Sequence, residues 1–334
     1  HITVADNPTT GGVWVAIGAA ADVRIAVDGA VLGFSGPRVV TAMTDRPLPE
    51  GGNTAASAYA AGLVDMVATH EEVGGLLERV LAALAPDHPQ AVEAPPAGTP
   101  EARDAAVQVA ASRESDRPTG DQLLTTLLTE AVPLRGADDT TTAAIGRIAG
   151  RCAVGVALAG PRNAMPGPGG YALLSRAAKL AGAMDAALVV LIDTPGADPH
   201  REAAGLVPAM GQALLDVLQT RAPTVALVHG EGGSGGALAG AVTDLVGVGE
   251  FGWFAALGPE GAAAALRTSP DDAARIMRIT PTELLADGFA DAFVSPGGER
   301  AWCVSAIDAI RDIPMEQRLE KRYERWKSPL PDQM

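Results

Sequence analysis

The groups best suited to chemistry in this chain are backbone amides at two runs of glycine. The longer run, Gly-Gly-Ser-Gly-Gly at 232–236, follows an apolar stretch and is expected to turn a strand into a helix. A glycine has no β-carbon, so a ligand can approach its main chain closely. The first N–H groups of a helix have no internal partner and lie at the positive end of its dipole. Amides at Gly235 and Gly236 therefore suit an oxygen that gains negative charge.

The shorter run, Gly11-Gly12, stands in a similar context near the N-terminus. In both places a small-residue stretch and an aspartate follow, and then a Gly-Pro pair, at 36–37 and at 258–259. The shared order and approximate spacing indicate two copies of one unit. We expect each copy to place a Gly-Gly pair where a strand passes into a helix.

A second turn, Thr-Pro-Gly-Ala at 194–197, also follows an apolar stretch. Neighbouring parallel strands end on the same side of a sheet, so this turn is expected to face the glycine run. Two amides from two turns make an oxyanion hole, which assigns Gly196 and Ala197 to the same hole as Gly235 and Gly236. The structural alternative is an ordinary turn in which glycine permits tight packing of strand and helix.

The substrate-binding residues are expected on these turns and on the loop that precedes the helix at 171. They are Gly232, Gly233, Ser234, Pro195, Met165, Tyr171, Gly36 and Pro37.

Other chemistries fit the glycine run less well. It lacks the Lys-Ser/Thr of a phosphate-binding P-loop and the GxGxxG spacing of a dinucleotide fold. Ser234 stands in a GxSxG frame, but no histidine follows it, so the chain order of an α/β-hydrolase fails. Glu231 and Glu260 are candidates for general acid–base work, although a structural role near the turn is the preferred interpretation.

Apolar periodicity predicts the elements that position these turns. The expected strands are 2–5, 23–27, 31–34, 153–159, 187–192 and 224–228. The expected helices are a buried one at 13–21, amphipathic ones at 73–84 and at the C-terminus, and two more at 171–184 and 210–220. Alternating strands and helices predict βαβ units and a largely parallel sheet. The C-terminal helix, with Leu319, Tyr323 and Trp326 on one face, is expected to dock on another surface.

Composition limits the function classes. A net charge of −15 argues against a nucleic-acid surface, and no apolar run is long enough for a membrane span. Two cysteines make neither a zinc cluster nor a disulfide framework, so we expect no metal and a reduced, cytoplasmic compartment. We also expect the natural chain to begin upstream of His1.

Several segments of the chain resemble those of a known family. Segments 192–197, 230–239, 258–261 and 279–285 resemble the carboxyltransferase α subunit of bacterial acetyl-CoA carboxylase, as do 116–118 and 322–325. Segments 6–13, 33–39 and 62–65 are similar to the C-terminal part of the β subunit. The resemblance implies a β–α fusion with an α/β fold of the tandem crotonase (ClpP/crotonase-like) type, a ββα superhelix in two related units.

The expected organisation is a β-subunit-like half at 1–85, a Pro-rich linker at 86–119 that is part disordered and part extended, and an α-subunit-like half at 120–334. The first half lacks the family's zinc ribbon and upstream glycine-rich helix, so it is expected to be incomplete at its N-terminus.

The resemblance implies transfer of a carboxyl group from carboxybiotin to an acyl-CoA, of the acetyl-CoA to malonyl-CoA type. The enolate and the ureido oxygen each need an oxyanion hole, with Gly11 and Gly12 supplying part of the second. The implied partners are a biotin carboxyl carrier protein, a biotin carboxylase and further copies of this chain. Because basic residues usual in the family are missing after Tyr171, two alternatives stay open: a biotin-independent decarboxylase of a malonyl-type thioester, and a non-catalytic scaffold subunit.

Overall fold

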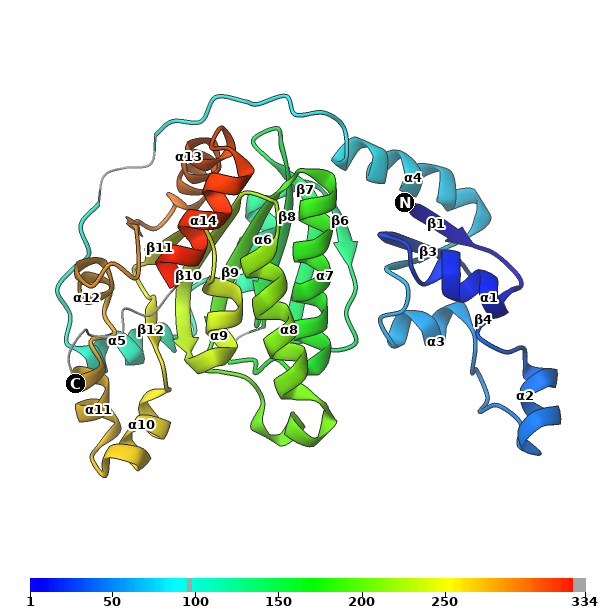
Figure 1. Ribbon diagram of the computed structural model, residues 1–334, viewed down its shortest axis with the longest axis horizontal. Coiled ribbons are helices and arrows are strands. Elements are labelled where there is room, and N and C mark those ends of the chain that lie inside the picture. The colour runs from blue at the N-terminus through cyan, green and yellow to red at the C-terminus, as the bar shows by residue number, and fades with distance from the viewer. Residues whose placement is uncertain (95–97, 162, 327–334) are drawn as a thin grey trace.

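The computed structural model describes residues 1–94, 98–161 and 163–326, which form two units of unequal size (Figure 1). The strands of the first unit are β1 (Ile2–Ala5), β2 (Thr9–Thr10), β3 (Val23–Val27), β4 (Leu32–Gly33) and β5 (Met66–Ala68). Its helices are α1 (Gly11–Val13), the π-helical turn η1 (Trp14–Gly18), α2 (Pro37–Thr44), α3 (Ala55–Ala60) and α4 (His70–Ala83). Strands β1, β3 and β5 form a parallel sheet, and β2 pairs with β4.

The second unit is built on one large sheet. Its strands are β6 (Thr129–Leu134), β7 (Thr141–Ile148), β8 (Arg151–Leu158), β9 (Ala187–Thr194), β10 (Thr224–Gly233), β11 (Leu245–Gly249), β12 (Trp253–Ala255) and β13 (Ala292–Val294). Their order is β13-β11-β10-β9-β8-β7-β6, with β12 also on β10. The sheet is parallel from β8 to β13, as expected. The hairpin β6–β7 runs antiparallel at the edge, which the sequence interpretation missed.

Helices cover both faces of this sheet. They are α6 (Gly120–Leu127), α7 (Pro168–Met184), the 3₁₀ turn η2 (Pro199–Ala204), α8 (Leu206–Gln219), α9 (Ser234–Ala241), α13 (Glu299–Arg311) and α14 (Met315–Trp326). The core on one face joins α7, α8 and α9 to Val190, Ile192 and Val228. The core on the other face joins α6 and α13 to Leu191 and Leu227. Alternate residues of a strand point to opposite faces, so each buried strand serves both cores.

A smaller group of helices surrounds β12: α5 (Ala105–Ser112), α10 (Pro259–Leu266), α11 (Pro270–Met277) and α12 (Pro281–Ala286). Helix α5 lies inside the segment expected to be a linker, so the expectation of extended or disordered chain was wrong there. Val109 of α5 packs with Trp253 and Ile279, and the Trp253 indole donates to Ser112 at 2.9 Å.

The two units share one hydrophobic core. Val80 and Ala83 of α4 pack with Val132 of β6 and Ile145 of β7. The buried Arg147 donates to the carbonyls of Ala82 and Ala83, in the last turn of α4, and to that of Ala85 just beyond the helix. The amphipathic helix predicted at 73–84 is confirmed, and its apolar face closes the junction.

Two helix predictions differ from the structure in their burial. The helix expected to be buried at 13–21 exposes Val13, Val15 and Ile17 by 52–58 %, and Trp14 is its large buried side chain. Helix α14 docks as expected, with Trp326 packed against the core, and arginines that the sequence interpretation did not use add to the contact. Arg322 donates to the last carbonyls of α8 and pairs with Asp244 at 2.7 Å, while Tyr323 is 39 % exposed.

Candidate active site

The glycine run and the Pro-Gly turn meet at one edge of the sheet. Strand β10 ends at Gly233 and helix α9 begins at Ser234, so the strand-to-helix turn is confirmed. Thr194, the last residue of β9, is the parallel partner of Gly232. The turn at 195–197 therefore lies against the first turn of α9, as the sequence predicts.

The glycines of the run differ in the room around them. A β-carbon on Gly232 would lie 2.5 Å from the Trp253 carbonyl oxygen, and one on Gly233 would overlap the Pro195 carbonyl. These two positions need glycine because backbones pack closely there. At Gly235 the nearest atom would be the Met210 methyl at 3.7 Å, so the chain is open on that side.

Gly236 stands at the centre of the corner between the two turns. A β-carbon there would lie 2.5 Å from the Ala197 nitrogen and 2.6 Å from the Tyr171 hydroxyl oxygen. Any side chain at 236 would therefore collide with both of these groups. We call the Gly235 and Gly236 amides, the Ala197 amide and the Tyr171 hydroxyl the glycine corner.

The amides of the glycine corner are available to a ligand. Gly235 and Gly236 are the second and third residues of α9, whose N–H groups have no intrahelical acceptor. Within the described ranges, no protein group accepts from the Ala197 N–H. The Gly196 N–H, in contrast, donates to Thr194 Oγ1 at 3.1 Å. Gly196 has φ of +143°, a conformation that favours glycine, so its role is to shape the turn.

Tyr171 brings a side chain to this corner from the first turn of α7. It is fully buried, and its hydroxyl has no hydrogen-bond partner among the described residues. Burial, with a smaller contribution from Asp138, raises the pKa of Tyr171, so the hydroxyl keeps its proton. A buried donor without an acceptor is costly and needs an explanation, such as a ligand. Met165, in the loop before α7, is 36 % exposed.

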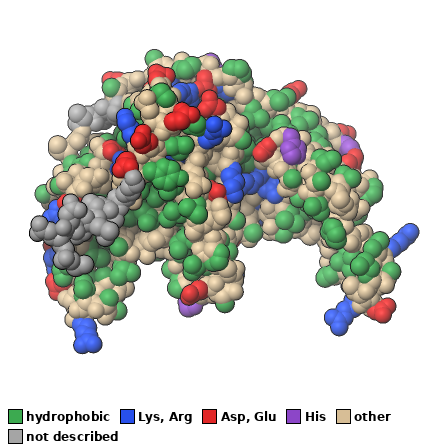
Figure 2. Space-filling model, in the orientation of Figure 1, with side chains coloured by type: hydrophobic (Ala, Val, Ile, Leu, Met, Phe, Trp, Pro, Cys, Tyr) green, Lys and Arg blue, Asp and Glu red, His purple; other side chains and the backbone are tan. Residues whose placement is uncertain are grey.

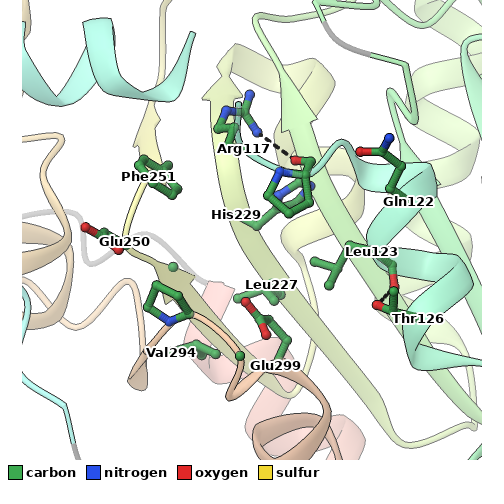
Figure 3. Close-up of a pocket in the computed structure, with 14 residues that line it drawn as sticks. Arg117, Gln122, Leu123, Thr126, Leu227, His229, Glu250, Phe251, Val294 and Glu299 are labelled. Carbon is green, nitrogen blue, oxygen red and sulfur yellow. Dashed lines mark hydrogen bonds between the residues drawn. The ribbon is translucent and has the colours of Figure 1, made fainter. Parts of the chain in front are cut away.

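The structure does not support a serine hydrolase at Ser234. Ser234 has φ of 64°, a strained left-handed conformation that lets the chain turn sharply from β10 into α9. His229 lies on β10 on the same face as Leu227, toward α6 and α13 (Figure 3). Its side chain is therefore on the opposite face of the sheet from α9. His200 is exposed in η2.

The carboxylates near the turn have structural roles. Arg113 donates to Glu231 at 2.6 Å and to Glu260 at 2.7 Å. Burial raises the pKa of Glu231, and the hydrogen bond from Arg113 opposes this rise. Arg117 pairs with Asp193 through two hydrogen bonds of 2.7 Å, and Asp193 also accepts from the Glu231 N–H at 3.0 Å. These pairs fix the ends of β9 and β10 beneath the glycine corner.

A cavity of about 450 Å³ lies behind these pairs, on the α6 and α13 face (Figure 3). Arg117, Gln122, Leu227, His229 and Glu299 are among its lining residues. It is distinct from the glycine corner, because β10 stands between them.

The predicted site residues of the first unit lie apart from this corner. Gly11 and Gly12 open α1, and Gly36 and Pro37 open α2, in the unit that lies beyond α7 in Figure 1. A β-carbon on Gly12 or Gly36 would meet nothing within 4 Å, so both are open to solvent. Within one chain, the structure does not bring Gly11 and Gly12 to face Gly235 and Gly236.

The described part of the chain offers neither a metal-binding cluster nor a membrane-spanning helix. No group of three or more His, Cys, Asp or Glu side chains there is placed to hold a metal ion. In the same residues, no helix has the length and apolar character needed to cross a membrane.

The fold is that of crotonase-like carboxyltransferases. The transcarboxylase 12S structure with hydrolysed methylmalonyl-coenzyme A bound superimposes with a TM-score of 0.79 over 92 % of this chain and 64 % of that one, at 18 % identity. A single-chain, multi-domain long-chain acyl-CoA carboxylase gives a TM-score of 0.71 over 91 % of this chain and 32 % of that one, also at 18 % identity. The predicted fold class is confirmed.

The family follows from the sequence. Residues 102–328 match the model of the acetyl co-enzyme A carboxylase carboxyltransferase-like family, and the chain belongs to that family. The acetyl-coenzyme A carboxylase carboxyl transferase subunits beta/alpha of Salinispora tropica are 35 % identical over 88 % of this chain. The probable biotin-dependent acyl-coenzyme A carboxylase beta3 subunit of Mycobacterium bovis is 32 % identical over 96 % of this chain and 70 % of its own length.

This chain is shorter than these relatives. It spans 57 % of the length of the Salinispora tropica protein and 61 % of that of the Salinispora arenicola protein.

Proposed function

We propose that this chain is a carboxyltransferase component of a biotin-dependent acyl-CoA carboxylase. It would move a carboxyl group from N1 of carboxybiotin to the α-carbon of an acyl-CoA, of the acetyl-CoA to malonyl-CoA type. Biotin on a carrier protein supplies the transferable carboxyl group. The observation that carries the proposal is the glycine corner, where unpaired amides of two turns converge beside a buried hydroxyl.

The role of the glycine corner is to hold one developing oxyanion. The Gly235, Gly236 and Ala197 amides would donate to it, and the α9 dipole adds a favourable field. Fixed donors need no reorganisation when charge appears, and losing one costs about 2.7–4 kcal/mol in characterised enzymes. Gly232, Gly233, Pro195 and Gly196 would act indirectly by fixing the two turns.

The second oxyanion would be held by the first unit. Gly11 and Gly12 open a helical turn there, and Gly36 and Pro37 open α2, all on a surface without a facing turn in the same chain. We infer that the two Gly-Gly pairs face each other between copies of the chain in a homo-oligomer. A biotin carboxyl carrier protein and a biotin carboxylase would be the further partners.

An assay of the reverse reaction tests the proposal. The protein is incubated with malonyl-CoA, with and without free biotin, and acetyl-CoA is measured. Strictly biotin-dependent release of acetyl-CoA is expected. Release without biotin would contradict the proposal and favour the malonyl-type decarboxylase, whose enolate needs the same amides. Silence in both arms, with activity only when an intact partner is added, would leave a scaffold subunit.

A further inference from the structure

A cavity of about 450 Å³ lies at the junction of the two units, away from the glycine corner. One wall comes from the first unit, at 19–22 and Arg24, and the other from one face of α7. The α7 residues are Ala172, Ser175, Arg176, Lys179, Leu180 and Ala183. Figure 2 shows Lys and Arg side chains gathered near the middle of this face of the molecule, over α7. The volume is in the range of small-molecule sites.

The Asp65 carboxylate at this junction has all of its hydrogen-bond acceptor sites filled. Asp65 is buried, and its Oδ1 accepts from the Arg135 N–H at 2.8 Å and from Arg176 Nη1 at 2.7 Å. Its Oδ2 accepts from the Arg24 N–H at 2.8 Å and from Arg176 Nη2 at 2.7 Å. A carboxylate offers about four lone-pair sites. Asp65 therefore has no acceptor site left for another donor.

The Nε of Arg24 is left without a hydrogen-bond acceptor among the described residues, although Arg24 forms an ion pair with Asp65. Its Nε lies 3.6 Å from Asp65 Oδ2, and among the described residues no acceptor lies within hydrogen-bond reach of that atom. The residue is only 9 % exposed. Two guanidinium groups thus share one carboxylate, which leaves a buried positive charge. A buried, incompletely paired charge destabilises a fold unless something neutralises it.

Two other charged side chains, Lys179 and Asp22, line the cavity. Lys179 lies 2.9 Å from Asp216, and it also contacts Ser175. Asp22 also lines the first-unit wall, and its carbonyl accepts from Arg176 at 2.6 Å. Arg24 is therefore the cation in this wall that has the most hydrogen-bonding capacity to offer a ligand.

We propose that this cavity binds a small anion that carries a phosphoryl group, with Arg24 as its main ligand and Arg176 and Lys179 beside it. The planar guanidinium fork matches two oxygens of a phosphate, and a tetrahedral phosphate has further oxygens for the ammonium of Lys179. The binding would neutralise the excess charge and tie the first unit to α7. This inference does not depend on the proposed carboxyl transfer.

The test measures thermal unfolding and calorimetric binding at constant ionic strength, with three probes: inorganic phosphate, adenosine 3′,5′-bisphosphate and malonate. The variant is Arg24→Met, which keeps the length of the side chain and removes the charge. The matched control is Arg46→Met, an exposed arginine of the same unit. Arg24→Lys, which keeps the charge but not the fork, is the second variant.

We expect phosphate to raise the unfolding temperature of the wild type and of Arg46→Met in a saturable way. Arg24→Met should bind it about tenfold more weakly or worse, and Arg24→Lys should be intermediate. Without any anion, Arg24→Met should unfold at the same temperature as the wild type or a higher one, because an unpaired charge has been removed. If Arg24 only stabilised the fold, Arg24→Met would lower the unfolding temperature in the absence of an anion.

The probes also identify the occupant. Tighter binding of adenosine 3′,5′-bisphosphate than of phosphate would identify a phosphorylated nucleotide, and equal binding would identify free phosphate. Equal or tighter binding of malonate would overturn the phosphoryl assignment. Equal phosphate responses of Arg24→Met and Arg46→Met would overturn the site itself.

Discussion

Tyr171 and Gly236 show how single residues define the glycine corner. The tyrosine hydroxyl and the Ala197 nitrogen both lie within 2.6 Å of the position that a β-carbon on Gly236 would occupy. The sequence placed all three residues near the site, because turns after parallel strands meet at one sheet edge. The sequence did not reveal that the Tyr171 hydroxyl lacks a hydrogen-bond partner among the described residues. Nor did it reveal that the Gly196 N–H donates to Thr194 Oγ1, since both facts depend on exact side-chain placement.

Tyr171→Phe should make the protein more stable and less active. Removing a buried hydroxyl without an acceptor should raise the free energy of unfolding by about 1 kcal/mol. If the hydroxyl serves a bound ligand, kcat for biotin-dependent decarboxylation should fall. Chemical denaturation and the malonyl-CoA assay measure the two effects. Unchanged kcat would remove Tyr171 from the site, and a loss of stability would mean that the hydroxyl has a protein partner.

At the scale of elements, apolar periodicity found the buried strands and the helices of the second unit. It failed where polar contacts decide the structure. Helix α5 is short, follows a Pro-rich stretch and is held by Asp104, which accepts from the Ala106 N–H at 3.0 Å and pairs with Arg275 of α11 at 2.7 Å. Helix α14 docks by its arginines as well as by the predicted Trp326. Periodicity cannot reveal such contacts between distant segments.

The docking of α5 should depend on acid. The hydrogen bond from Arg275 holds the pKa of Asp104 below its ordinary value of 3.8, against the opposing effect of desolvation. Because the pKa is lower in the folded state, this pairing stabilises the fold above the unfolded value. The contribution is lost as the pH falls through the lower, folded value. The protection of the amides at 105–112 against hydrogen exchange, expressed relative to the intrinsic rate at each pH, should therefore fall in acid.

Asp104→Asn is the matched variant, because asparagine still caps a helix but cannot pair with arginine. It should show less protection in α5 than the wild type near neutral pH, and the difference should disappear as the pH falls through the lowered, folded pKa of Asp104. A difference that persists in strong acid would contradict this assignment.

At the scale of the molecule, the first unit exposes an unusual number of apolar side chains. Phe34 is 73 % exposed and Met43 is 76 % exposed, and α2 has no buried residue. Val13, Val15 and Ile17 add to this surface. Large exposed apolar surfaces typically mark interaction sites. The repeat in the sequence suggested facing half-sites, and only the structure reveals that they do not face each other within one chain.

The double variant Phe34→Glu, Met43→Glu should weaken self-association, because burying two carboxylates in an apolar contact is costly. Analytical ultracentrifugation should find a lower mass than for the wild type, and biotin-dependent activity should fall with it. The control is Ile276→Glu, an apolar residue on α11 in the second unit that is 63 % exposed. An unchanged mass for the double variant would exclude this surface as the contact between copies.

The central claim is that the glycine corner stabilises charge in carboxyl transfer. The most direct measurement compares kcat for biotin-dependent malonyl-CoA decarboxylation in Gly236→Ala and Gly211→Ala. A methyl group at 236 meets the Ala197 nitrogen and the Tyr171 hydroxyl, whereas at 211, in α8, it meets nothing within 4 Å. We predict that Gly236→Ala lowers kcat by about 10²-fold or more with the fold retained by circular dichroism, and that Gly211→Ala does not. Equal, wild-type kcat in both variants would contradict the account.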